Sequence, residues 1–323
     1  MESGKISFVM ASLLVWMLSL CLPPVAEAVD RVVVIPMGTG GTPLQNVVTV
    51  AKSKGQFTDP VAAMNSITDA SATNPYLLYI GPGQYTLTTA LIMKPFVNVT
   101  GSGEQVTWLI GNISSNAPDQ TSAIVKGANN AALSNLSVSN NGGGANSIGI
   151  FTTGLNLTAR LQNVSVYAKG GQGNAGVVNM NSSPIITGLN IAVTDAGALL
   201  NVGISNNGSS PTILGVNILV WEGDSAVGIF NFTNSVPLIE GSNIFASGPS
   251  SSVGVLNTSS NEVKIKRSTV SGTTNGLKNI GSSDTRLSQS TLINGAAGGG
   301  YTCAFVDNNL GKVYALVECF MAQ

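Results

Sequence analysis

The chain has 323 residues, of which only 9% are charged, and its formal net charge at pH 7 is −1. A balanced charge gives no electrostatic basis for binding nucleic acid or an anionic membrane surface, so neither is expected as a partner. The sequence contains no histidine, which excludes Ser-His and Cys-His nucleophile systems and histidine-based metal sites.

Residues 1–28 have the pattern of an export signal peptide. After an early lysine, residues 7–18 form a short apolar core, and Ala26-Glu27-Ala28 forms a small-x-small cleavage site. Because Pro23-Pro24 ends the apolar run early, we expect no membrane span after cleavage. The prediction is a mature chain of residues 29–323 that is secreted, periplasmic or at the cell surface.

Two cysteines remain after cleavage, Cys303 and Cys319. In an oxidising compartment they could pair and staple the C-terminal end. A simple hairpin centred on residues 307–309 would not place them directly opposite each other. The sequence therefore leaves open whether they are bonded.

Four segments within residues 47–112 carry a family resemblance: Val48–Lys52, Gly55–Ile67, Leu78–Tyr85 and Val97–Gly103. They resemble the opening of pectinesterases and, more widely, of pectin-lyase-like right-handed β-helix proteins. In that family the block forms a strand, a short capping helix and the first coils, so the resemblance implies this fold. Residues 59–67 fit the helix, with Asp59 as its N-cap and Pro60 at its first position. The helix would cover the open apolar end of the solenoid, since terminal caps are needed there. The pectinesterase active-centre motifs, which resemble Gln-Ala-Val, Gln-Asp-Thr-Leu, Asp-Phe-Ile-Phe-Gly and Gly-Arg-Pro-Trp, are absent, so no catalytic residue is carried over.

Two motifs recur through residues 122–300. One places glycine at positions 149, 176, 203, 228, 254 and 276. A fixed period of this size indicates a stack of like units. The second motif has an asparagine followed by apolar residues one and three places later, which is the alternation of a strand with one buried face. We predict an all-β, single-stranded right-handed parallel β-helix with two short strands per repeat, closed by strands in residues 301–323.

Asparagines aligned at a corner of each coil are predicted to form two structural ladders. Asn tolerates the left-handed backbone of a corner, and stacked amides can donate and accept along the column. Binding of a ligand by these amides is the less favoured alternative. One ladder would be Asn179, Asn206, Asn231, Asn257 and Asn279, and the other Asn135, Asn163, Asn190, Asn217 and Asn243.

Asp195 and Glu222 each lie five residues after a ladder asparagine, which places them at the same corner of successive coils. With Asp224 and Lys169 nearby, such a cluster could perform acid/base catalysis or bind Ca²⁺. The favoured alternative is a set of unrelated polar residues on a solvated turn. Apart from this Ca²⁺ hypothesis, the sequence predicts no metal site and no cofactor.

Four apolar side chains are predicted to point outward from one sheet. Tyr167 and Trp221 lie four residues after their asparagines, and Leu219 and Phe245 lie two after theirs. This stripe could stack on sugar rings or contact another protein, unless a loop folds over it.

We therefore predict an exported, non-catalytic β-helix that binds polysaccharide or an envelope or surface protein. A divergent polysaccharide-active enzyme (esterase, lyase or hydrolase) is the alternative, with Asp195, Glu222 and Asp224 as its acids and Lys169 as a base. A structural stalk is a third hypothesis.

Overall fold

The computed structural model describes residues 46–260, 262–304, 306–308 and 312–314. This part of the chain forms a parallel β-solenoid that contains one α-helix, so the predicted all-β, parallel β-helix fold is confirmed. None of the helices in these residues is long and apolar enough to span a bilayer. The predicted signal peptide and Cys319 lie outside the described residues, so the pairing of the buried Cys303 stays a prediction.

One complete turn of the solenoid, called a rung below, contains three strands. In a central rung these are β12 (Ile185–Thr187), β13 (Asn190–Thr194) and β14 (Leu200–Asn207). We name the three faces of the solenoid the β12, β13 and β14 faces after them. The prediction of two strands per repeat is wrong, because a three-residue strand such as β12 is too short to show an alternating pattern.

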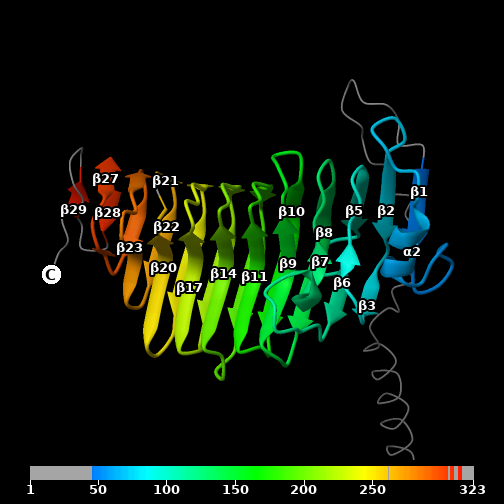
Figure 1. Cartoon of the computed structure of the whole chain (residues 1–323), viewed down its shortest axis with the longest axis horizontal. Coiled ribbons are helices and arrows are strands. Elements are labelled where there is room, and N and C mark those ends of the chain that lie inside the picture. The colour runs from blue at the N-terminus through cyan, green and yellow to red at the C-terminus, as the bar shows by residue number, and fades with distance from the viewer. Residues whose placement is uncertain (1–45, 261, 305, 309–311, 315–323) are drawn as a thin grey trace, which may run out of the picture. The chain divides into compact units, whose positions relative to one another are not determined.

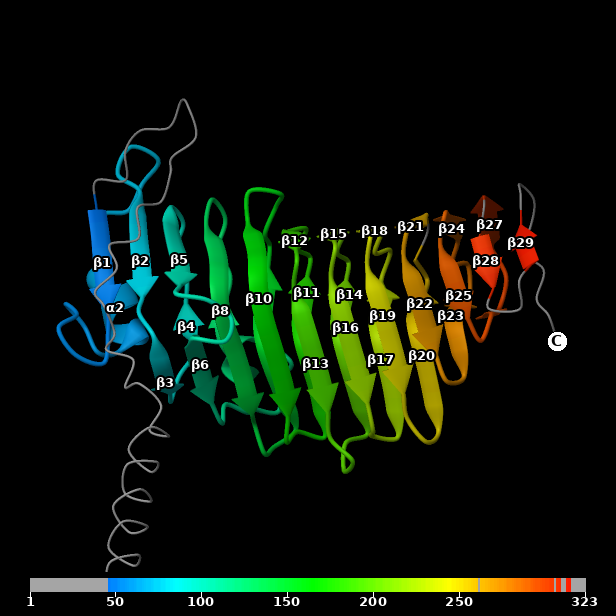
Figure 2. The same cartoon turned by 180° about the vertical axis from the view of Figure 1, so that it is seen from behind.

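Each strand pairs in parallel with its counterpart in the next rung, apart from the antiparallel pair β28–β29. Figure 1 shows strands of the β14 face side by side, and Figure 2 shows those of the β13 face from behind. The β12 face contains β1 (Asn46–Val50), β2 (Tyr76–Ile80), β5 (Val97–Gly101), β12, β15 (Thr212–Leu214), β18 (Leu238–Glu240), β21 (Val263–Lys266), β24 (Thr285–Ser288) and β27 (Tyr301–Ala304). The β13 face contains β3 (Gly83–Leu87), β6 (Thr107–Gly111), β13, β16 (Asn217–Trp221), β19 (Asn243–Ser247), β22 (Thr269–Gly272), β25 (Thr291–Ile293), β28 (Val306–Asn308) and β29 (Lys312–Tyr314), and the long strands β8 (Ala132–Asn141) and β10 (Arg160–Lys169) run through both of these faces. The β14 face contains β4 (Leu91–Ile92), β7 (Ala123–Lys126), β9 (Asn146–Thr153), β11 (Gly173–Met180), β14, β17 (Ser225–Phe232), β20 (Ser251–Thr258), β23 (Asn275–Ile280) and β26 (Ala296–Ala297).

The predicted N-terminal helix is present as α2 (Pro60–Ser66). The Asp59 carboxylate accepts hydrogen bonds from the backbone N–H groups of Val61 and Ala62, at 3.0 and 3.3 Å, and so caps the helix as predicted. The helix buries Ala63 and Met64 in the same apolar core as the first strands. A 3₁₀ turn, η1 (Gln120–Ser122), lies beside β7 and β9.

The repeated glycine has a steric cause. A Cβ atom on Gly203 of β14 would lie 2.3 Å from Cγ2 of Ile218 on β16 and 2.5 Å from the backbone oxygen of Gly228. Gly176 and Gly254 meet the same kinds of neighbours in their own rungs. The glycine therefore lets the β14 face approach the β13 face across the core, and no side chain fits there.

The first predicted ladder is present as one chain of buried side-chain amides. Each Nδ2 donates to Oδ1 of the asparagine in the next rung, over distances of 2.7–2.9 Å. At one end the Thr152 hydroxyl donates to the first asparagine, and at the other the last amide donates to the carbonyl groups of Gly299 and Gly300. Every amide is thus paired inside the core, as buried polar groups must be. The members are Asn179, Asn206, Asn231, Asn257 and Asn279.

The second predicted ladder is wrong in its first two members. Asn135 and Asn163 lie at a corner in the left-handed conformation, with φ of 55° and 51°, and the next residue of that corner column is Gly188, with φ of 63°. Asn190 pairs with Ser165. The error arose because the corner changes from asparagine to glycine between these rungs, while a different asparagine begins the following strand two residues later.

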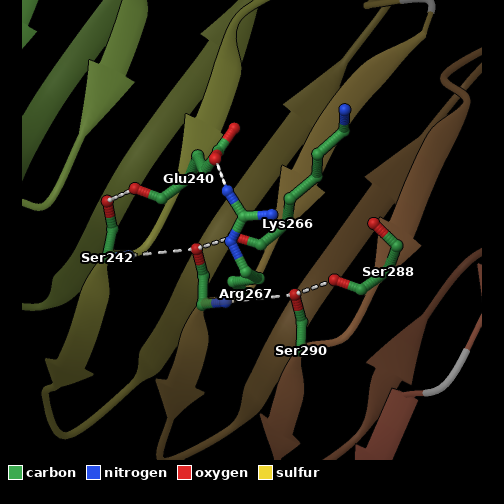
Figure 3. A network of polar contacts seen from close by, with 7 residues as sticks. Glu240, Ser242, Lys266, Arg267, Ser288 and Ser290 are labelled. Atoms are coloured by element: carbon green, nitrogen blue, oxygen red, sulfur yellow. Dashed lines mark hydrogen bonds and ion pairs between the residues drawn. The ribbon is translucent and has the colours of Figure 1, made fainter.

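A serine ladder follows the same corner in the C-terminal rungs (Figure 3). The Ser268 hydroxyl accepts from the backbone N–H of Ser242 at 3.1 Å, and the Ser290 hydroxyl accepts from the N–H of Ser268 at 3.2 Å. Beside it on the surface, Arg267 forms an ion pair with Glu240. The buried hydroxyls satisfy backbone groups at this corner, whereas the buried amides of the first ladder mainly pair with one another.

Tyr301 joins the last rungs to the end of the amide ladder. Its hydroxyl accepts from the backbone N–H of Asn279 at 2.9 Å and donates to the carbonyl oxygen of Ala297. Burial raises the pKa of Tyr301 to about 12, although the Asn279 hydrogen bond opposes this shift. The raised pKa means that its contribution to stability is complete below pH ~10 and is lost as the pH rises through ~12, because only the unfolded chain ionises readily in between.

We expect Tyr301→Phe to lower the free energy of unfolding by about 1 kcal/mol at pH 7 and to reduce its decline between pH 10 and 12. Urea unfolding of both proteins at pH 8 and pH 11 measures this. An equal decline in the two proteins would contradict the role of this tyrosine.

Candidate functional site

The outer side of the β13 face carries two columns of side chains that repeat from rung to rung. They point outward because inward residues of the same strands, such as Val166, Ile191 and Ile218, are buried in the core. The backbone register aligns Trp108, Ser137, Ser165, Asn190, Asn217 and Asn243 in the first column, and Ile110, Ser139, Tyr167, Ala192, Leu219 and Phe245 in the second.

An aromatic pair lies at one end of these columns. The rings of Trp108 on β6 and Tyr167 on β10 stack with centroids 5.5 Å apart and planes at 25°. The strand between them, β8, presents the small residues Ser137 and Ser139 to this side, which leaves room for the two rings to meet. Trp108 was not among the predicted site residues, because it lies in the irregular first coils, before the repeats.

The other three predicted stripe residues also lie on this side. Leu219 and Phe245 are 50% and 40% exposed, so no loop of the described chain buries them. Trp221 is half-buried and lies two positions further along β16, next to Thr194 on β13. The predicted alignment of Tyr167 with Trp221 is wrong: Tyr167 shares its column with Leu219, because the register is set by Ser165 and not by the corner asparagine.

Glu104, in the turn between β5 and β6, reaches onto the first column. Its Oε2 accepts from the Ser165 hydroxyl at 2.5 Å and from Nδ2 of Asn190 at 3.1 Å, and its backbone oxygen accepts from the Ser137 hydroxyl. The loop thus covers part of the column without reaching the exposed apolar residues. The sequence offered only one signal for this residue, an isolated acid in the glycine-containing turn Ser102–Gln105.

From Glu104 an amide ladder continues along the surface. Asn217 donates to Oδ1 of Asn190, and Asn243 donates to Oδ1 of Asn217, both at 3.1 Å. These asparagines are exposed, unlike those of the buried ladder. Their donation runs toward the N-terminal rungs and ends on the Glu104 carboxylate. The last three members of the predicted second ladder are therefore surface groups of the candidate site.

The predicted acidic cluster lies at the rim where the β13 face turns toward the β14 face. Both carboxylate oxygens of Asp195 accept backbone hydrogen bonds, from Gly170 at 2.7 Å and from Gly197 at 2.9 Å. Glu222 accepts from the Thr194 hydroxyl at 2.6 Å and has a left-handed backbone, with φ of 65°. These contacts hold the two carboxylates to turns of adjacent rungs, and no step of catalysis follows from them.

Asp224 and Lys169 are exposed near that rim. Within the described residues no group of three or more Asp, Glu, Cys or His side chains could hold a metal ion. Calcium binding therefore stays a prediction. A hollow of about 520 Å³ lies beside Asp195, lined mainly by glycine backbone and by Asn116 and Gln172.

A different surface occurs on the outer side of the β14 face. A groove of about 330 Å³ is lined there by Ile148, Val178, Leu200 and the contacting ring pair Phe230 and Phe232, whose centroids are 4.8 Å apart. No lining residue of this groove is charged. This groove therefore contains a second pair of aromatic rings, on a different face from the Trp108–Tyr167 pair.

No protein-family model matches the sequence, and no curated protein matches it. Among solved structures, pectate lyase Pel9A matches with a TM-score of 0.56 and 14% identity, over 85% of this chain and 82% of that chain. A pectin methylesterase from carrot matches with a TM-score of 0.50 and 12% identity, over 85% of each chain. Likeness at this level of identity concerns the fold alone. The chain therefore has the pectin-lyase-like right-handed parallel β-helix fold, as the resemblance of residues 47–112 implied.

Proposed function

We propose that the protein is an exported β-helix that binds glycan on the outer side of its β13 face. The observation that carries the proposal is the partly exposed Trp108–Tyr167 stack beside the surface amide ladder. Aromatic rings supply apolar contact for the C–H faces of sugars, while amide and carboxylate groups hydrogen-bond sugar hydroxyls. Leu219 and Phe245 extend the apolar contact along the same side.

Export to the cell envelope or beyond is part of the proposal and is supported by the signal-like residues 1–28. A surface or envelope protein is the competing partner for the same side. We favour glycan because the apolar residues of the second column lie directly beside the serines and asparagines of the first, whereas a stable protein interface has a more apolar centre.

We expect Trp108→Ala and Tyr167→Ala each to weaken binding to a recognised polysaccharide about tenfold, because each removes one ring of the stack. Affinity electrophoresis of the full-length chain through gels that contain single polysaccharides measures the change. Phe230→Ala, which disrupts the ring pair of the β14 face, is the matched control and should bind like the wild type. If both ring variants bind every tested polysaccharide like the wild type, the site is wrongly placed.

A divergent polysaccharide-active enzyme is the second candidate function, supported by the hollow beside Asp195. A hydrolase or lyase would need carboxylates at this rim as acid and base. Turnover of any polysaccharide that disappears in the Asp195→Asn and Glu222→Gln variants would establish it. Turnover that survives both changes would exclude these residues as its catalytic groups.

A further inference from the structure

The proposed glycan site is surrounded by acidic side chains. From the β5–β6 turn to β22, that turn, the outer side of the β13 face and the loops that lead to the β14 face contain one basic side chain, Lys169. Lys126 of β7, which interacts electrostatically with Asp119, lies on the β14 face itself. The formal charge of this described region is therefore −4, from one basic and five acidic groups. The acidic groups are Glu104, Asp119, Asp195, Glu222 and Asp224.

Two of these acids are held in place by hydrogen bonds. Asp119 caps η1, and the hydroxyl and backbone N–H of Thr121 hold the pKa of its carboxyl below the usual value. Asp195 accepts two backbone N–H groups. A polymer bound here meets fixed negative charge at the rim.

The polar groups left free on this side suit hydroxyl groups. Within the described residues, Oε1 of Glu104 and Oδ1 of Asn243 accept no hydrogen bond, while the exposed amides of the surface ladder present N–H donors. A sugar hydroxyl can donate to the former and accept from the latter. A uronate carboxylate can only accept hydrogen bonds, so it cannot use these two free acceptors, and the charge of Glu104 repels it.

We propose that this site takes a neutral glycan and discriminates against polyuronates; the inference rests on the proposed glycan-binding function. The known proteins that share the fold include a pectate lyase and a pectin methylesterase, whereas the charge of this face opposes an anionic chain. Each uronate placed beside one of these acids lowers affinity about tenfold at low ionic strength.

The test compares one polymer in two charge states. A panel of neutral polysaccharides is screened with the full-length chain, and the polymer that binds is then oxidised at its primary hydroxyls to carboxylates. At low ionic strength, with a chelator present, we expect the oxidised polymer to bind at least tenfold more weakly. Added salt should reduce this difference, because exposed charges more than ~10 Å apart are screened at 0.1 M.

Variants then locate the origin of the discrimination. Glu104→Gln combined with Glu222→Gln should reduce the tenfold preference to about threefold or less by strengthening binding of the oxidised polymer. Glu262→Gln removes an exposed carboxylate that pairs with Arg286 at the edge of the β12 face, so it should leave the preference unchanged.

The outcomes separate the two proposals. Binding of the oxidised polymer as tightly as the neutral one, with or without added Ca²⁺, and lost in Tyr167→Ala, would overturn the neutral-glycan inference and leave glycan binding intact. No binding to any polysaccharide would overturn both and leave a protein partner for this side.

Discussion

Asn206→Leu is expected to lower the free energy of unfolding by about 4 kcal/mol. The leucine fills a similar volume, but it leaves the amide of Asn179 without its acceptor and the carbonyl of Asn231 without its donor. All three side chains are fully buried, so water cannot replace the lost partners, and each orphaned group costs about 1–3 kcal/mol. Urea unfolding followed by circular dichroism measures the change.

The protein contains its own control for this experiment. Asn217 also donates to one neighbouring asparagine and accepts from another, at 3.1 Å on each side, but it is exposed. Asn217→Leu should change stability by no more than about 0.5 kcal/mol, because water satisfies the groups it leaves. If the two leucine variants unfold alike, burial does not set the contribution of an asparagine ladder.

Gly203→Ala is expected to destabilise the protein by about 3 kcal/mol through overpacking. The new methyl group would meet Cγ2 of Ile218, which belongs to a stiff β-branched side chain buried in the core. It would also meet the backbone oxygen of Gly228, which could not move without disturbing the next rung. The same unfolding experiment applies.

Two further glycine variants separate crowding from backbone conformation. Gly215 has φ of 58° and open space around it, so Gly215→Ala should cost about 1 kcal/mol from the left-handed backbone alone. At Gly197 the nearest atom would be 3.5 Å away with no unfavourable φ, so Gly197→Ala should be nearly neutral. A Gly203 variant no worse than the Gly215 variant would refute the close approach of the two faces.

The repeats in the sequence were sufficient to predict the stacking of rungs and the buried ladder. Asn179 and Asn206 recur in phase with the same glycine motif, and in the structure they are direct partners in neighbouring strands. Their register is reliable because glycine, apolar residue and asparagine all repeat together on one strand. The third strand of each rung was missed because three residues cannot display a period of two.

The candidate site was only partly predictable. Leu219 and Phe245 follow from alternation within regular strands. Tyr167 was assigned to the wrong column because the corner asparagine of its strand lies two residues before Ser165, which is the partner of Asn190. Trp108 and Glu104 come from irregular coils, and they reach Tyr167 and Asn190 across 59 and 86 positions of the chain. Pattern within a repeat carries no information about such contacts, since they depend on how a non-repeating loop folds over the stack.

The buried asparagine ladder has a direction, and its two ends need different partners. A hydroxyl donor from Thr152 begins it, and carbonyl acceptors at Gly299 and Gly300 end it. A whole repeat of about 26 residues inserted between these ends would donate to one neighbour, accept from the other and leave both terminal partners in use. The same repeat added beyond either end would leave one of these terminal partners in the middle of the column, where an asparagine is needed. Such a chain can therefore change its length over evolution by internal duplication, in steps of one rung, while its two ends stay fixed.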